Sequence, residues 1–207
     1  MADILLSLSA LWLVAVLTPG PNMLFFSGVA LSSSGRALAA AGAGILLGTG
    51  LWGLSGLFGL LWLFEALPAL AVAVKVAGGA YLAWIGLKLL RGGLSRTTAQ
   101  AGRPERTPPL SASRAFTLGL LTNLANPKSL VFVTSLFAVT RIAEAPLPVG
   151  LAGVGIMMGM SGTYYVLFGA ALKLSPLGRG SGWWKRVIGV ALGAAMMAFG
   201  ARMAWER

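Results

Sequence analysis

The sequence predicts an all-α integral membrane protein, a bundle of six transmembrane helices. Hydrophobic residues make up 57% of the 207-residue chain, charged residues only 10%, and the mean hydropathy is +0.83. A transmembrane helix needs roughly 20 apolar residues, and the chain holds six segments of that kind. They run over about residues 4–31, 37–64, 68–90, 115–140, 147–172 and 187–204. We therefore expect one transmembrane domain over residues 1–207.

The first segment is interrupted near its middle by Thr18-Pro19-Gly20-Pro21-Asn22. An unpaired backbone N–H or C=O costs several kcal/mol in a bilayer, so a helix breaks at depth only where protein or a cavity satisfies the freed groups. A rise of about 1.5 Å per residue puts Pro19 roughly 22 Å below the outer end of the helix, inside the hydrocarbon core. Because Met1-Ala2-Asp3 lacks the positive charge of a secretory signal, we expect this helix to be retained.

The second and third segments carry small residues, an aromatic residue and a charge. Gly44 and Gly48 stand at a spacing that lets helix backbones approach closely. Trp52 is a candidate wall of an apolar pocket. Lys75 is one of two charges predicted well inside helices, where a central lysine costs about 2.5 to 3.5 kcal/mol. Its ammonium can reach the outer interface, and it is also a candidate coupling residue.

The polar stretch at residues 92–114 is rich in Ser, Thr, Gly, Pro and Arg. It predicts a solvated loop between two three-helix halves, residues 1–91 and 115–207. The fourth segment is interrupted by Asn123-Leu124-Ala125-Asn126-Pro127-Lys128, with Asn126 roughly 17 Å above the inner end of the helix. Paired breaks in corresponding segments are the best sequence-level indication of a transporter's binding site.

The fifth and sixth segments support an internal repeat. One constant shift places Gly44 and Gly48 on Gly155 and Gly159, and it also places the run Lys75-Val76-Ala77-Gly78 on Arg186-Val187-Ile188-Gly189. Three helices per half make such a repeat inverted in the membrane. We expect the paired glycines of both halves to pack tightly against neighbouring helices.

The two breaks together offer the groups that a zwitterion needs. An unwound helix presents free N–H groups on its second half and free carbonyls on its first, which suit a carboxylate and an ammonium respectively. The side-chain amides of Asn22 and Asn126 each carry a donor and an acceptor. For Asn123 a helix-bridging hydrogen bond is favoured. The predicted substrate-binding residues are Thr18, Pro19, Gly20, Pro21, Asn22, Asn126, Pro127 and Lys128. Further candidates for the pocket wall or for coupling are Trp52, Lys75 and Asn123.

Lys128 is the deeper of the two intramembrane lysines, and no acid lies in any predicted span to neutralise it. Three functional roles are open: binding a substrate carboxylate, pairing with carbonyls released by Pro127, or titrating during transport. A purely structural pairing has equal weight.

The net charge of +11 does not indicate a nucleic-acid partner, because the basic residues lie in loops that flank the membrane. If six helices alternate, most of these residues face one side, which should be the cytoplasm, and both termini lie outside. The residues of that side are Arg36, Lys88, Arg91, Arg96, Arg103, Arg106, Arg114, Lys173, Arg179, Lys185 and Arg186. Because the chain has no cysteine and no histidine, we expect no disulfide, no metal site and no cofactor.

These features resemble the LysE/RhtB-type amino-acid exporters of bacteria, which include lysine, threonine and homoserine efflux proteins. The resemblance rests on Leu17-Thr18-Pro19-Gly20-Pro21-Asn22, on Gly42 to Gly48, on Lys75 to Gly86 and on Phe116 to Lys128. It implies six helices in the bacterial inner membrane and export of amino acids or related small zwitterions from the cytoplasm, driven by the proton-motive force.

The chain departs from many members at two places. It reads Phe132-Val133-Thr134-Ser135-Leu136-Phe137 where they show a Pro-Gln-Phe stretch, and Thr49, Trp52 and Gly53 where they place a more polar residue. An apolar pocket around Trp52 would favour an uncharged or hydrophobic side chain over lysine.

The sequence leaves three alternatives to amino-acid export: a cation exporter, an enzyme and a passive scaffold. An exporter of inorganic cations in the same superfamily is the alternative, although without membrane acids its site would be built from carbonyls. An enzyme is disfavoured, because the spans hold no His, Cys, Asp or Glu and leave only a pair of Lys128 with Ser129 or Ser135. A passive scaffold would gain nothing from paired breaks. The expected contacts are an amino-acid substrate, membrane lipid and, for so small a bundle, a second copy in a homodimer.

Overall fold

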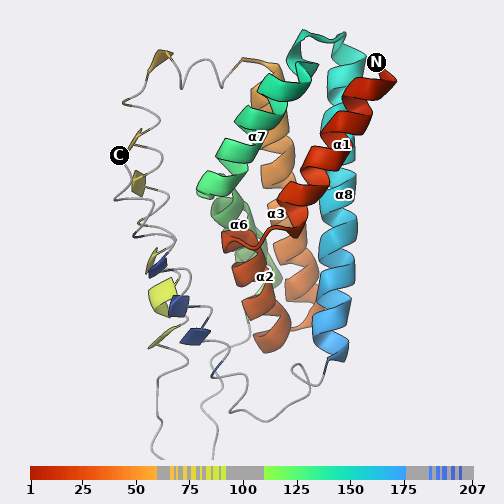
Figure 1. Cartoon of the computed structure of the whole chain (residues 1–207). Helices are drawn as coiled ribbons and strands as arrows, with labels where there is room; N and C mark the ends of the chain where they lie inside the picture. The colour runs from red at the N-terminus through yellow and green to blue at the C-terminus, as the bar shows by residue number, and fades with distance from the viewer. Residues whose placement is uncertain are drawn as a thin grey trace, which may run out of the picture.

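The structure of the protein is a computed structural model, and it describes residues 1–59 and 110–175, with scattered positions between 66 and 91 and between 187 and 201. Every regular element of this part of the chain is helical, and it contains no strand. The elements are α1 (Ala2–Leu17), α2 (Pro21–Ser32), α3 (Gly35–Leu57), α6 (Ala112–Leu124), α7 (Pro127–Thr140), the 3-10 turn η1 (Ile142–Glu144) and α8 (Leu147–Leu174) (Figure 1).

Two of these helices, α3 and α8, are each long and apolar enough to cross a membrane. Helices α1 and α2 meet the same criterion as a pair bent by 55°. The described part of the chain therefore holds up to three spans by length and composition. Helices α6 and α7, which form the predicted fourth segment, are too short to meet this criterion. The predicted third and sixth spans, residues 68–90 and 187–204, lie largely outside the described residues, so the count of six stays a prediction.

Both predicted helix breaks are present, and proline sterics explain each of them. Helix α1 ends at Thr18, which is extended (φ −71°, ψ 124°), and α2 begins with Pro21. Helix α7 begins with Pro127, directly after Asn126 (φ −81°, ψ 109°). Proline is tolerated at the first helical position because no N–H is needed there, whereas it pushes the preceding residue out of the helical region.

Glycines bring α3 and α6 into backbone contact. A Cβ added at Gly44 would lie 2.1 Å from the carbonyl oxygen of Phe116, and one at Gly119 would lie 2.4 Å from that of Ala41. Only glycine fits at such a crossing, which confirms the expected packing role of Gly44. For Gly155 and Gly159 the expectation of tight packing is wrong within the described residues, because a Cβ there would have no described neighbour within 4 Å.

The described core forms two apolar clusters, one toward each end of the bundle. The first contains α1, α7 and η1 residues such as Leu8, Val133 and Ile142. The second contains residues such as Phe26 and Ala37 from α2 and α3. Both helix breaks lie between these clusters, so the polar residues at the breaks are enclosed by apolar packing above and below.

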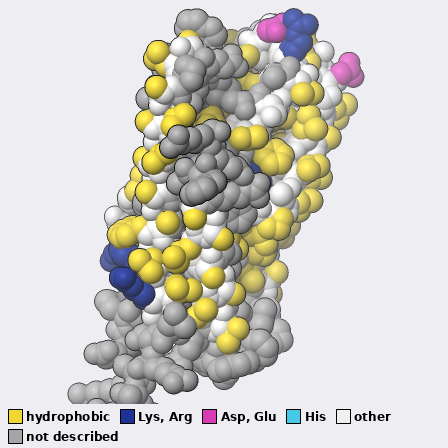
Figure 2. All heavy atoms as spheres, turned by 60° about the vertical axis from the view of Figure 1, so that its left-hand side comes forward, with side chains coloured by type: hydrophobic (Ala, Val, Ile, Leu, Met, Phe, Trp, Pro, Cys, Tyr) yellow, Lys and Arg dark blue, Asp and Glu magenta, His cyan; other side chains and the backbone are white. Residues whose placement is uncertain are grey.

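The two ends of the bundle differ in charge. The N-terminus and the α7–α8 connection lie at one end, and the α2–α3 junction, the start of α6 and the end of α8 lie at the other (Figure 1). Arg141 and Glu144 form an exposed ion pair at the first end, where the Arg141 guanidinium lowers the pKa of the Glu144 carboxyl by hydrogen bonding. In Figure 2, acidic side chains are visible at the first end only, basic side chains are visible at both ends, and mostly apolar side chains lie between them.

Candidate functional site: a polar pocket at the two helix breaks

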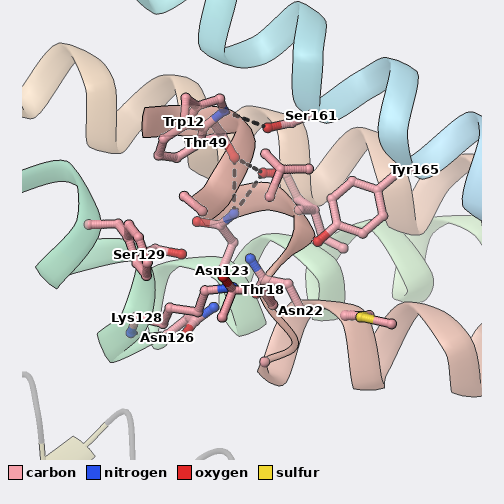
Figure 3. Close-up of a pocket in the computed structure, with 16 residues that line it drawn as sticks. Trp12, Thr18, Asn22, Thr49, Asn123, Asn126, Lys128, Ser129, Ser161 and Tyr165 are labelled. Carbon is pink, nitrogen blue, oxygen red and sulfur yellow. Dashed lines mark hydrogen bonds between the residues drawn. The ribbon is translucent and has the colours of Figure 1, made fainter. Parts of the chain in front are cut away.

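A pocket lies at the level of the two breaks and is bounded by side chains of six helices (Figure 3). It offers about 50 Å³ to the centres of water-sized molecules, enough for a few waters. The lining residues are Trp12, Ala15, Val16, Thr18, Gly20, Asn22, Met23, Ile45, Thr49, Asn123, Asn126, Lys128, Ser129, Phe132, Ser161 and Tyr165.

Lys128 links the first break to the second. Its Nζ donates a hydrogen bond to the backbone oxygen of Thr18, one of the carbonyls released where α1 ends. The same ammonium lies 5.6 Å from the centroid of the Phe132 ring, within the range of a cation–π contact. A Cβ at Gly20 would come within 3.0 Å of the Lys128 Cδ, so the glycine leaves room for the lysine stem. None of the lining residues that the structure describes is acidic.

Asn126 has a structural task in addition to lining the pocket. Its Oδ1 accepts a hydrogen bond of 3.0 Å from the backbone N–H of Lys128, so it caps the N-terminus of α7. The side chain is buried, 3% exposed. The sequence predicted this amide as a substrate ligand, but its acceptor oxygen is already engaged by the helix.

Asn123 bridges α6 and α3, as expected. Its Nδ2 donates to the Ile45 carbonyl at 3.0 Å and to Thr49 Oγ1 at 3.2 Å. The backbone carbonyl of Asn123 accepts a hydrogen bond from Trp52 Nε1 at 3.2 Å. A Cβ at Gly48 would lie 2.8 Å from the Asn123 Cβ, so glycine at this position lets the amide reach α3. The side chain is 1% exposed, yet its Oδ1 has no hydrogen-bond partner.

Comparison with known proteins places this architecture in a family. Residues 13–207 match the family described as LysE type translocator. The chain belongs to the LysE type translocators. It is 35% identical to the threonine efflux protein of Escherichia coli strain K12 over 138 residues, which are 67% of this chain and 66% of that protein. The alignment thus spans slightly less than two thirds of that relative.

Two further relatives cover different shares of the chain. The membrane protein YahN of Escherichia coli strain K12 is 31% identical over 199 residues, 95% of this translocator and 86% of YahN. The leucine efflux protein of Klebsiella pneumoniae is 28% identical over 122 residues, 59% of this chain and 56% of that protein. No solved structure matches the chain.

Three lining residues with polar atoms were not singled out from the sequence of this translocator: Trp12, Ser161 and Tyr165. The Trp12 Nε1 donates to the Met157 carbonyl at 2.9 Å and to Ser161 Oγ at 3.1 Å, which ties α1 to α8. Tyr165 lines the pocket one turn further along α8. The signal was present, since Ser161 and Tyr165 are polar residues in the middle of an otherwise apolar segment, but they lie near no break.

The structure brings most of the predicted site residues together and places others outside the pocket lining. Six of them line the pocket: Thr18, Gly20, Asn22, Asn123, Asn126 and Lys128. Pro19 and Pro21 are absent from the described lining and belong to the first break itself, and Pro127 is the first residue of α7 at the second break. Trp52 does not form the pocket wall; it is buried behind the pocket as a donor to Asn123. Lys75 lies outside the described residues.

Proposed function

We propose that this translocator exports amino acids from the cytoplasm as a secondary transporter, with the pocket at the two breaks as its substrate site. One observation carries the proposal: the Lys128 ammonium donates a hydrogen bond to a released carbonyl of the other broken helix, at a pocket that lies between two apolar clusters. Broken helices that face a cavity at this depth are the usual construction of a site for small charged solutes.

The chemistry of the pocket favours a zwitterion with a neutral side chain. Lys128 supplies a cation for a carboxylate, and the amides of Asn22 and Asn123 supply neutral polar groups. A second positive charge on the substrate side chain would meet no acidic residue in the described part of the lining. Similarity to proteins named for threonine and leucine efflux supports the same class. L-Threonine and L-leucine are therefore the first substrates to test.

The proposed mechanism is alternating access. Residues 1–91 and 115–207 form two inverted repeats in this proposal, each opened by a broken helix, and one repeat rocks against the other around the pocket. The apolar cluster at each end acts as the gate of that end, because separating it opens the pocket to one side only.

The proposed orientation follows the distribution of basic residues. The translocator lies in the bacterial inner membrane with both termini outside and the loop at 92–114 in the cytoplasm. Arg36, Arg114 and Lys173 then lie on the cytoplasmic side, and Asp3 with Glu144 on the outer side. Export would run from the basic end of the bundle to the acidic end, driven by the proton-motive force.

A flux assay tests the proposal. Inside-out vesicles that contain the protein are supplied with labelled L-threonine, L-leucine and L-lysine, with and without a proton gradient. We expect gradient-dependent uptake of the neutral amino acids, little uptake of lysine, and loss of uptake in Lys128→Met. A full set of amino acids that gives no flux in any condition would contradict the proposal. Competition by metal ions in the same vesicles would then favour the cation exporter.

A further inference from the structure

The amide of Asn123 has an orientation that its partners fix. Its Nδ2 donates to the Ile45 carbonyl, which can only accept, so the nitrogen and oxygen of this amide cannot be exchanged. The second donor proton of the amide goes to Thr49 Oγ1. The Oδ1 is therefore the atom left without a partner, in a side chain that lines the pocket and is 1% exposed.

A second unpartnered oxygen belongs to the same pocket. Asn22, in the first turn of α2, also lines it, and its Oδ1 is buried without a hydrogen bond. The two amides come from different broken helices, and Figure 3 shows both directed into the region between those helices. Buried polar atoms in native proteins are nearly always paired. Two unpaired acceptors in one pocket indicate that a donor from outside the chain forms hydrogen bonds with them.

The charge of Lys128 determines which end of a zwitterionic substrate lies near the lysine and which end lies near the two amides. Lys128 already presents an ammonium to the Thr18 carbonyl, so a second ammonium beside it would be repelled and a carboxylate would be attracted. An ammonium has only donors, three in number, and the two amide oxygens are acceptors. The two neutral acceptors and the cation thus divide the pocket into an amine end and a carboxylate end.

We propose that Asn22 and Asn123 form an ammonium subsite through their Oδ1 atoms, and that the substrate lies with its carboxylate toward Lys128 and its amine toward these two amides. The inference rests on the proposed function and sets the direction in which the substrate lies. It also gives Asn123 two separate tasks, since its Nδ2 holds α6 to α3 while its Oδ1 serves the substrate. Asn22 has no hydrogen bond to maintain through that oxygen, so it is the better position to vary.

The experiment compares analogues that lack one charged group. Purified protein in lipid nanodiscs binds labelled L-leucine, and three unlabelled competitors are titrated: L-leucine, 2-hydroxy-4-methylpentanoate, in which a hydroxyl replaces the ammonium, and L-leucinamide, in which the carboxylate is neutral. The same set built on L-threonine is run in parallel. The variants are Asn22→Leu, Asn22→Asp and Lys128→Met. Ser55→Leu is the matched control, because it removes a polar side chain from α3 that does not line the pocket.

The expected results separate the two ends of the substrate. Asn22→Leu lowers the preference for the amino acid over the hydroxy acid by about tenfold or more, the usual effect of one hydrogen bond to a charged group. Asn22→Leu leaves the preference for L-leucine over L-leucinamide unchanged. Asn22→Asp keeps an acceptor and retains the preference for the ammonium. Lys128→Met lowers the preference for the amino acid over the amide and leaves its preference over the hydroxy acid unchanged. Ser55→Leu changes neither preference.

Two results would overturn the inference while leaving the proposed function in place. One is an equal weakening of all three competitors in Asn22→Leu, which would make Asn22 a structural residue. The other is a loss of carboxylate preference in that variant, which would reverse the direction of the substrate. If neither L-leucine nor L-threonine binds the intact protein, the proposed function fails and this inference fails with it.

Discussion

Lys128 is the residue at which the two broken helices meet. Its ammonium satisfies a carbonyl of Thr18 that the end of α1 leaves free, so a partly buried charge and a broken helix stabilise one another. A substrate carboxylate placed in the pocket would compete with that carbonyl for the same cation. At the scale of the residue, the hydrogen bond is therefore both a structural link and a contact that transport must remake.

Removal of the Lys128 charge should slow transport strongly without preventing insertion. In Lys128→Met the apolar stem is retained, but the carboxylate of the substrate loses its cation and the Thr18 carbonyl loses its donor. We expect flux to fall by roughly 10- to 100-fold, the range for a hydrogen bond to a charged group. Flux of labelled L-threonine and L-leucine measures it, with membrane-inserted protein quantified beside it. Normal flux in the variant would leave Lys128 a structural role only.

Asn126 should behave as a helix cap. Asn126→Ala removes the acceptor of the Lys128 N–H and should lower the free energy of unfolding by about 1 kcal/mol, whereas Asn126→Asp keeps a capping oxygen. Thermal unfolding of the detergent-solubilised protein compares the two. Equal melting temperatures for Asn126→Ala and the parent protein would show that the cap contributes nothing.

The helices themselves were largely predictable from the sequence, and their contacts were not. Pro21 and Pro127 fix the start of α2 and α7 through local sterics, which any reader of the sequence can apply. Which side of a helix meets a neighbour depends on tertiary packing. For that reason Gly44 and Gly155, which look equivalent in the sequence, differ in the structure, and Trp52 lies behind the pocket instead of in its wall.

This difference between glycines can be measured as a matched pair. In Gly44→Ala the new methyl group would clash with the Phe116 carbonyl, so α3 and α6 must separate, and we expect a loss of stability of about 1 to 3 kcal/mol. In Gly155→Ala the methyl meets no described atom, and better helix propensity should add up to about 1 kcal/mol. Thermal unfolding of both variants tests this. A larger loss for Gly155→Ala than for Gly44→Ala would refute the helix arrangement.

At the scale of the whole molecule, the pocket lies between an apolar cluster at each end, and the ends carry different charges. The sequence predicted the depth of the breaks and the basic end, because both follow from counting along the chain. It did not predict that Trp12 and Ser161 join α1 to α8 across the pocket. Their separation in sequence, 149 residues, means that only the folded chain brings them together.

The orientation of the molecule can be tested with cysteines, because the natural chain has none. Single substitutions Asp3→Cys and Glu144→Cys should react with a membrane-impermeant maleimide added to intact cells. Arg36→Cys and Arg114→Cys should react only after the cells are permeabilised. If Asp3→Cys and Glu144→Cys were labelled only after permeabilisation, the orientation would be the inverse of the proposed one. The direction of transport would then have to be reconsidered as uptake.

The most direct test of the central claim, that the pocket at the two breaks is the substrate site, is protection of a cysteine inside it. Ser129→Cys places one thiol on the pocket lining, and its alkylation rate is measured in reconstituted protein with and without L-threonine or L-leucine, after transport by the variant has been verified. We predict that a transported amino acid slows alkylation, while Ser55→Cys on α3, outside the lining, reacts at the same rate in both conditions. Unchanged alkylation of Ser129→Cys at saturating concentrations of a transported amino acid would contradict the account.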